Sequence, residues 1–155
     1  MLLPIAGLLD KLVYFPPLSQ TKMKLFDTKI IAVSNQKGGV GKTTSAVNIA
    51  AYLAVTETPT LLIDMDPQAN ATSGVGIEIG SYKQSIYDVV IGKAKLSDVV
   101  QKTDLEFLDV VPSSAQLVGA EIELVSLFSR ERMLKEALED VEGKYKYIII
   151  DSPPS

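Results

Sequence analysis

The chain has 155 residues, with 15 Lys and Arg against 19 Asp and Glu, so its formal charge is −4. A hydrophobic fraction of 46% and a charged fraction of 22% are typical of one globular domain and exclude disorder as the main state. Cysteine and histidine are absent, which excludes disulfides, thiolate zinc sites, iron–sulfur clusters and a histidine base. Any catalysis must use Asp, Glu, Lys or hydroxyl groups, with an oxygen-liganded cation as the expected metal. The acidic balance argues against a broad DNA-binding surface on these residues.

The first 22 residues are apolar but lack the marks of a secretory signal. Residues 1–18 have no basic n-region and no small-residue cleavage site. An interfacial amphipathic helix is the second interpretation. Met23-Lys24-Leu25 resembles a natural start just before the first strand, so we expect residues 1–22 to be an extension outside the fold and 23–155 to form one domain. No apolar stretch reaches the roughly 20 residues of a membrane-spanning helix.

From Lys29 onward, strand and helix patterns alternate. Strands are expected at 30–34, 60–64, 105–111 and 147–151, and helices at 43–54, 85–90, 96–100 and 115–139. Short, continuously apolar strands separated by helices are typical of a parallel sheet covered on both faces. The helix at 43–54 is apolar on nearly all sides, which indicates a buried helix. The pattern predicts an α/β fold.

A glycine-rich turn links the first strand to the first helix. It reads Lys37-Gly38-Gly39-Val40-Gly41-Lys42-Thr43-Thr44. Glycines let successive backbone N–H groups converge on an anion at a helix N-terminus. The Lys42 ammonium would reach the β- and γ-phosphates of a nucleotide, and the Thr43 hydroxyl would bind Mg²⁺. Gln36 stands where the common phosphate-loop pattern has its first glycine, and Lys37 adds a second lysine.

Three acids follow apolar strands. Asp64 and Asp66 come at the end of the second strand, and Asp151 ends the last one. Ligands of open α/β sheets bind at the carboxyl ends of the strands. One carboxylate of the Asp64 and Asp66 pair would join the metal shell while the other orients a water molecule. Asp151 occupies the place of the outer-sphere Mg²⁺ partner in phosphate-loop enzymes.

These motifs resemble those of one known family. The loop is similar to the deviant Walker A motif of the ParA/MinD ATPases. The run Asp64-Met65-Asp66-Pro67-Gln68-Ala69-Asn70-Ala71-Thr72 resembles the D-x-D-P-Q-G-N-x-T segment of ParA and Soj partitioning proteins. Later segments at 111–114, 119–124 and 150–155 resemble ParA as well, so the similarity covers roughly residues 27–155. MinD-like cell-division ATPases differ after the D-x-D motif and are a further alternative.

The resemblance implies a P-loop NTPase that binds ATP and Mg²⁺ and closes as an ATP-sandwich homodimer. The phosphates would be held by the loop, with Thr44 at the α-phosphate and Lys37 reaching the partner's ATP. The implied catalytic residues are Lys37, Lys42 and Asp66, with Asp66 positioning the attacking water. The implied metal residues are Thr43, Asp64 as a supporting acid, and Asp151 as the Walker B aspartate.

The family also implies partners and a location. These are a ParB-type centromere-binding protein that stimulates hydrolysis, non-specific DNA, no membrane, and a cytoplasmic, nucleoid-associated position. The family continues beyond the point that corresponds to Ser155 with further strands, so we expect the missing strands to leave an apolar edge at 30–33. An alternative is therefore a truncated, non-hydrolysing nucleotide-binding or dimerisation fragment. Ala69 replaces the usual glycine, which is a mild change if its φ is negative.

Overall fold

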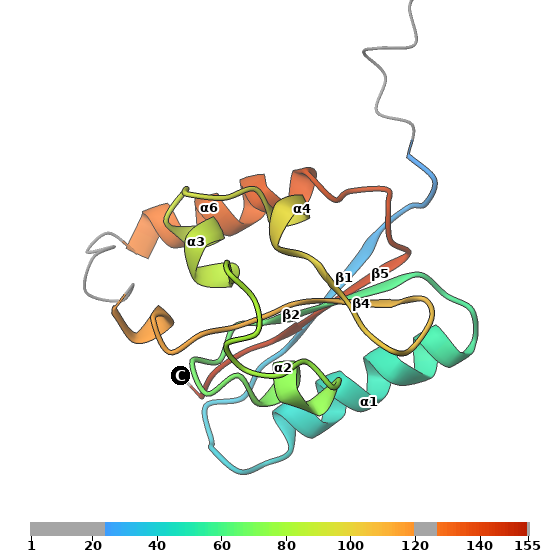
Figure 1. The fold of residues 1–155 in the computed structure, drawn as a ribbon, viewed down its shortest axis with the longest axis horizontal. Helices are drawn as coiled ribbons and strands as arrows, with labels where there is room; N and C mark the ends of the chain where they lie inside the picture. Colours follow the sequence, from blue (N-terminus) through green and yellow to red (C-terminus); the bar gives the residue numbers. More distant parts are fainter. Residues whose placement is uncertain (1–23, 120–126, 155) are drawn as a thin grey trace, which may run out of the picture.

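The structure is a computed structural model that describes residues 24–119 and 127–154 (Figure 1). The strands are β1 Lys29–Val33, β2 Thr60–Asp64, β3 Gln101–Lys102, β4 Leu108–Val111 and β5 Tyr147–Asp151. The helices are α1 Lys42–Val55, α2 Asn70–Gly74, α3 Ile86–Val90, α4 Leu96–Val99 and α6 Leu127–Glu139. The predicted domain division at residue 22 falls on residues outside those described and stays a prediction. Within the described residues, no helix is long and apolar enough to cross a membrane.

The five strands form one sheet in the order β1-β5-β2-β4-β3. All neighbours are parallel except β3, which pairs antiparallel with β4. The predicted parallel sheet is thereby confirmed, and the short β3 is an element that the sequence did not indicate. The strand β5 comes last in the described chain but lies between β1 and β2. This crossover brings the ends of three distant segments side by side.

Helices cover both faces of the sheet, as the sequence predicted. In Figure 1, α1 and α2 lie on one face, while α3, α4 and α6 lie on the other. Two apolar clusters match these faces. One centres on Leu62, Val110 and Ile149 against α1, and the other on Leu61, Ile63 and Ile148 against the opposite helices. Because alternate strand residues point to opposite faces, continuously apolar strands fill both clusters.

The first helix, which the sequence predicted to be buried, is buried along one side only. Only the alanine stripe of α1, Ala46, Ala50 and Ala54, is buried. Tyr52 and Val55 are 70% and 67% exposed. Small alanine side chains let the helix backbone approach the sheet closely, and the larger apolar residues then point outward.

Two predicted boundaries also differ from the structure. The strand expected from residue 105 begins at Leu108, because the Thr103 hydroxyl accepts from the Leu105 amide and donates to the Leu108 carbonyl, which closes a tight turn. Phe107 completes that turn with φ of 66°. The helix expected at 115–139 corresponds to a turn at 115–116, helical residues 117–119, and α6, with 120–126 outside the described residues.

The strand β1 is an edge of the sheet in the described part of the chain, as expected. It pairs with β5 alone. Ile30 and Ile31 are 52% and 39% exposed, on opposite faces of the strand. Such an edge presents unpaired backbone groups together with apolar side chains, which favours association with another strand.

Candidate functional site

The glycine-rich loop lies between the end of β1 and the start of α1. Gly39 and Gly41 have φ of 72° and 83°, and Gly41 is the N-cap of α1. This left-handed backbone favours glycine, and a Cβ built at Gly38, Gly39 or Gly41 meets no atom within 4 Å. The space next to these three glycines is therefore not filled by other parts of the described chain.

Two lysines frame this loop. The Lys42 ammonium donates to the Lys37 carbonyl oxygen at 3.2 Å, which holds the lysine across the loop. The Lys37 amide donates to Asn35 Oδ1 at 3.0 Å, while its side chain is exposed. Lys42 is thus placed over the helix N-terminus of its own chain, and the Lys37 side chain faces outward.

Asp151 ends β5 beside the loop, and its side chain is fully buried. Both of its carboxylate oxygens lack a hydrogen-bond partner among the described residues. Burial raises the pKa of Asp151; the nearby Thr43 hydroxyl and Lys42 ammonium act in the opposite direction, and the Asp66 charge raises it further. Asp151 is therefore a buried acid with free acceptor capacity directed at the loop.

Asp64 is also fully buried, but both of its carboxylate oxygens accept hydrogen bonds. Its Oδ2 accepts from the Thr72 amide at 2.8 Å and from the Thr72 hydroxyl at 2.7 Å, and its Oδ1 accepts from the Asp66 amide at 3.0 Å. Burial raises the pKa of Asp64, these three hydrogen bonds lower it, and the Asp151 charge raises it. Asp64 and Asp151 are register partners in adjacent strands. Two carboxylates at matched positions thus have opposite hydrogen-bond environments.

Asp66 lies in the turn between β2 and α2. Its Oδ1 accepts from the Gln68 amide at 2.9 Å, and its carbonyl oxygen accepts from the Ala69 amide at 2.9 Å. Ala69 has φ of 54°, so the condition under which its replacement of glycine would be mild is not met. A left-handed L-residue costs roughly 1–2 kcal/mol. The Asp66 charge raises the pKa of Asp151.

The structure brings most of the predicted site residues to one end of the sheet. Lys42, Thr43, Asp66 and Asp151 gather where β1, β2 and β5 end, while the side chains of Lys37, Val40 and Thr44 are exposed on the loop and first turn of α1. Within the described residues no cluster of three acidic side chains forms a metal cage. Magnesium usually binds through one or two protein groups together with substrate phosphates, so Thr43 and Asp151 fit that ion without a cage.

Two residues of this site were missed as functional from the sequence. Thr72 contacts Asp64 twice, and its hydroxyl oxygen accepts from the Ser113 amide at 3.1 Å. Both residues are fully buried. They appeared in the family-like segments at 64–72 and 111–114, but nothing local in those segments indicates that the two ends meet.

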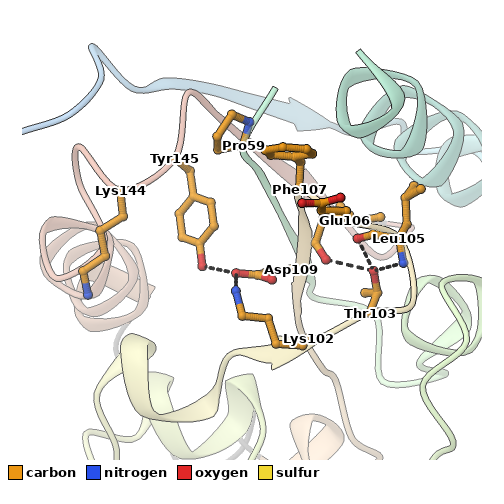
Figure 2. Close-up of a pocket in the computed structure, with 10 residues that line it drawn as sticks. Pro59, Lys102, Thr103, Leu105, Glu106, Phe107, Asp109, Lys144 and Tyr145 are labelled. Atoms are coloured by element: carbon orange, nitrogen blue, oxygen red, sulfur yellow. Dashed lines mark hydrogen bonds and ion pairs between the residues drawn. The ribbon is translucent and has the colours of Figure 1, made fainter. Parts of the chain in front are cut away.

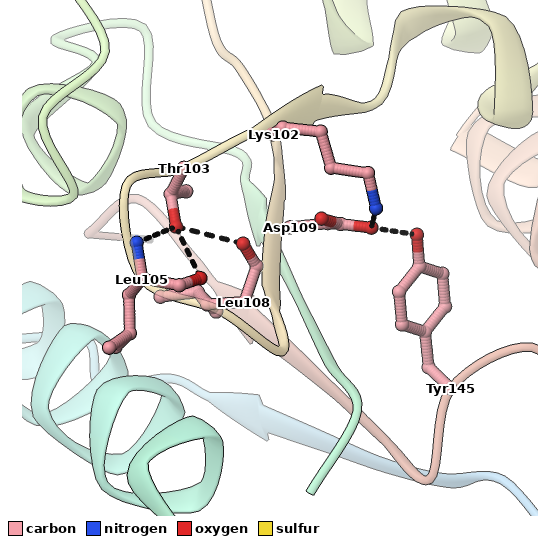
Figure 3. A network of polar contacts seen from close by, with 6 residues as sticks. All are labelled: Lys102, Thr103, Leu105, Leu108, Asp109 and Tyr145. Atoms are coloured by element: carbon pink, nitrogen blue, oxygen red, sulfur yellow. Dashed lines mark hydrogen bonds and ion pairs between the residues drawn. The ribbon is translucent and has the colours of Figure 1, made fainter. Parts of the chain in front are cut away.

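A separate cavity of about 380 Å³ lies at the opposite end of the strands (Figure 2). It contains none of the loop residues. Asp109 lies in its wall and accepts on Oδ2 from the Lys102 ammonium at 2.8 Å and from the Tyr145 hydroxyl at 2.7 Å (Figure 3). Burial raises the pKa of Tyr145, and the hydrogen bond to Asp109 and the negative charge of Asp109 raise it further. This network links β3 and β4 to the turn before β5, so the polar groups of Lys102, Asp109 and Tyr145 are explained by contacts that stabilise the fold.

The fold and the loop together define a phosphate-loop NTPase. The sequence profile of one family, described as an AAA domain, matches residues 28–155. The chain is 56% identical over 127 residues to the sporulation initiation inhibitor protein Soj of Bacillus subtilis, covering 82% of this chain and 50% of Soj. It is 50% identical to the chromosome partitioning protein ParA of Myxococcus xanthus, covering 82% of this chain and 45% of that protein. The chain belongs to the ParA/Soj family of partitioning ATPases and corresponds to its N-terminal part.

Solved structures agree with this fold. One is a protein from Mycobacterium smegmatis described as cobyrinic acid a,c-diamide synthase with bound ADP and magnesium, with a TM-score of 0.78 and 38% identity over 83% of this chain and 52% of that one. Another is a plasmid partition protein from Borrelia burgdorferi bound to AMPPNP, with a TM-score of 0.68 and 33% identity over 83% and 53% of the two chains. The present chain spans about half the length of the relatives it matches.

Proposed function

We propose that the chain binds ATP and Mg²⁺ at the loop formed by residues 37–44, as the N-terminal part of a partitioning ATPase. The observation that carries this proposal is Asp151. A fully buried carboxylate that has no hydrogen-bond partner among the described residues is costly to keep in a fold, by about 1–3 kcal/mol or more for a charged group. Such a group beside Thr43 and an open glycine loop is accounted for by a cation that supplies the missing partner.

We expect separate residues of this chain to hold the phosphates, the metal ion and the attacking water. The loop amides and Lys42 hold the phosphates, while Thr43 and Asp151 hold the metal ion. When bound, Mg²⁺ neutralises charge on the phosphate oxygens. Asp66 orients the attacking water, since its carboxylate lies at the same end of the sheet as Asp151. Asp64 holds the Asp66 turn in place, and its place among the metal residues stays a prediction.

The exposed Lys37 side chain supports an ATP-dependent homodimer in which each loop reaches the nucleotide of its partner. An added positive charge in trans stabilises the transferring phosphoryl group, as an arginine finger does. The resemblance to ParA and Soj partitioning proteins implies, for the whole protein, a ParB-type partner and non-specific DNA in the cytoplasm. The charge of −4 argues against a broad DNA-binding surface on these residues.

A titration with a fluorescent ATP analogue and Mg²⁺ tests the proposal. Lys42→Ala should abolish binding, because no other loop lysine crosses its own helix N-terminus. Lys144→Ala is the matched control, since Lys144 is exposed at the opposite end of the sheet and should leave binding unchanged. Equal affinity of Lys42→Ala and the unaltered chain would refute the phosphate contact.

The second candidate is a nucleotide-binding fragment without turnover. The open edge at β1 favours it, because loop amides need a rigid strand behind them to stay aligned. We expect weak or absent ATPase activity and no salt-resistant DNA binding from residues 1–155 alone. Steady turnover that disappears in Asp66→Ala would show instead that these residues are a sufficient enzyme.

A further inference from the structure

A continuous chain of hydrogen bonds runs from the end of β4 to the Asp66 turn. The Ser113 amide donates to the Thr72 hydroxyl oxygen at 3.1 Å. That hydroxyl donates to Asp64 Oδ2 at 2.7 Å, and Asp64 Oδ1 accepts from the Asp66 amide at 3.0 Å. The Thr72 amide adds a second bond to Asp64 Oδ2 at 2.8 Å.

The links that join Ser113, Thr72 and Asp64 are buried, and the link from Asp64 to the Asp66 amide is part-buried. Asp64, Thr72 and Ser113 all have zero exposed surface. A buried group that loses its partner finds no water to replace it, so the loss of one link leaves its neighbours unpaired. The far end is anchored as well, because the Tyr82 hydroxyl donates to the Ser113 carbonyl oxygen and the Ile86 amide donates to the Pro112 carbonyl oxygen at 2.9 Å.

The Thr72 hydroxyl cannot be replaced by an apolar group of the same shape. It acts at once as an acceptor for a backbone amide and as a donor to a carboxylate, which only a hydroxyl does at this size. With the hydroxyl removed, Asp64 Oδ2 keeps only the Thr72 amide as a donor, so the carboxylate is held less firmly against the Asp66 amide. The turn that carries Asp66 then loses one of its fixed contacts.

We propose that Thr72 is a positioning residue for Asp66, acting through the Asp64 carboxylate. This inference rests on the proposed function for the role of Asp66 in hydrolysis. The hydrogen-bond chain locks the ends of β2 and β4 to the turn that carries the water-orienting carboxylate. Its effect is on the placement of Asp66 and not on the binding of the phosphates by the loop.

Amide hydrogen exchange followed by NMR on the full 155-residue chain tests the proposal directly. In Thr72→Val the Asp66 amide should exchange at least about tenfold faster, relative to the amides of Leu62 and Ile149, which report opening of the whole sheet. Thr72→Ser restores the hydroxyl and should stay within about threefold of the unaltered chain. Ser73→Ala is the matched control, since Ser73 lies on the same helix and its hydroxyl donates to the Asn70 carbonyl oxygen.

Activity supplies a second readout wherever turnover is measurable. Thr72→Val should lower kcat for ATP while KM changes little, because the loop is untouched. Failure of ATP binding in the unaltered chain would contradict the proposed function, and the exchange result would still decide the role of Thr72. Equal relative exchange of Asp66 in Thr72→Val and the unaltered chain would overturn the proposal, as would a Thr72→Ser chain that behaves like Thr72→Val.

A measurement on the unaltered chain covers the case in which Thr72→Val does not fold. If the hydrogen-bond chain holds as one unit, the amides of Asp66, Thr72 and Ser113 should open together, with protection factors within about threefold of one another. An Asp66 amide that exchanges about a hundredfold faster than the other two would overturn the proposal.

Discussion

Replacing Asp by Asn should have opposite effects on the free energy of unfolding at Asp64 and at Asp151. Both side chains are fully buried at register positions of adjacent strands. Asp151 has no hydrogen-bond partner among the described residues, whereas Asp64 accepts three hydrogen bonds. We expect Asp151→Asn to raise the free energy of unfolding at pH 7 and Asp64→Asn to lower it.

The magnitudes follow from these environments. An unpaired buried charge costs about 1–3 kcal/mol or more, and the side-chain amide introduced by Asp151→Asn keeps part of that cost because it also lacks partners, so we expect a gain of about 1–2 kcal/mol. In Asp64→Asn the side-chain amide has only one oxygen for the three donors that contact Asp64. Its NH₂ group takes the place of the second oxygen and faces at least one of these donors. A loss of about 1–3 kcal/mol follows. The size of each side chain is nearly unchanged, so packing contributes little to either value.

The gain at Asp151 should also depend on pH. Burial raises the pKa of Asp151 in the fold above its ordinary value of 3.8, so the folded state binds more protons between 3.8 and the raised pKa. Stability therefore falls as pH rises through that window, and the penalty is fully present only above the raised pKa. The stabilisation by Asp151→Asn should be present at pH 7 and shrink toward pH 4.

Urea unfolding monitored by circular dichroism, without nucleotide or Mg²⁺, gives both free energies, provided that the m-values match. The two substitutions should be measured at pH 7 and near pH 4 in the same buffer series. A destabilising Asp151→Asn, or a gain that is the same at both pH values, would refute the argument that an unpaired charge is stored at this site. A neutral Asp64→Asn would refute the count of its hydrogen bonds.

Two further predictions concern stability away from the loop. Glu57 is exposed with φ of 57° just after α1, so Glu57→Gly should stabilise the fold by up to about 1 kcal/mol in the same urea assay, whereas Glu57→Ala should not. Tyr145→Phe removes the 2.7 Å hydrogen bond to the buried Asp109 and should cost about 1–2 kcal/mol with little dependence on salt. Lys102→Met, at a side chain that is 85% exposed, should cost less than about 1 kcal/mol and less still at high salt; a larger loss than that of Tyr145→Phe would contradict this order.

The sequence by itself determined the local features of this protein. The turn at residues 37–44 needs glycines at positive φ, and the strand that ends in Asp151 is continuously apolar, so both are legible from neighbouring residues alone. The same holds for β2, whose predicted and observed bounds are the same. The family similarity at 64–72 likewise pointed to Asp66 before any fold was known.

Only the tertiary structure decided how these features meet. The insertion of β5 between β1 and β2 sets Asp151 opposite Asp64, and that strand order comes from pairings between residues far apart in the chain. Asp64 has hydrogen-bond donors because Thr72 lies next to it, and Thr72 reaches that position because α2 packs back onto β2. The exposed sides of α1 escaped prediction for the same reason, since apolar periodicity does not say which face a sheet will cover. Hydrogen-bond partners and burial depend on contacts between residues that are distant in the chain, and a local sequence pattern does not specify those contacts.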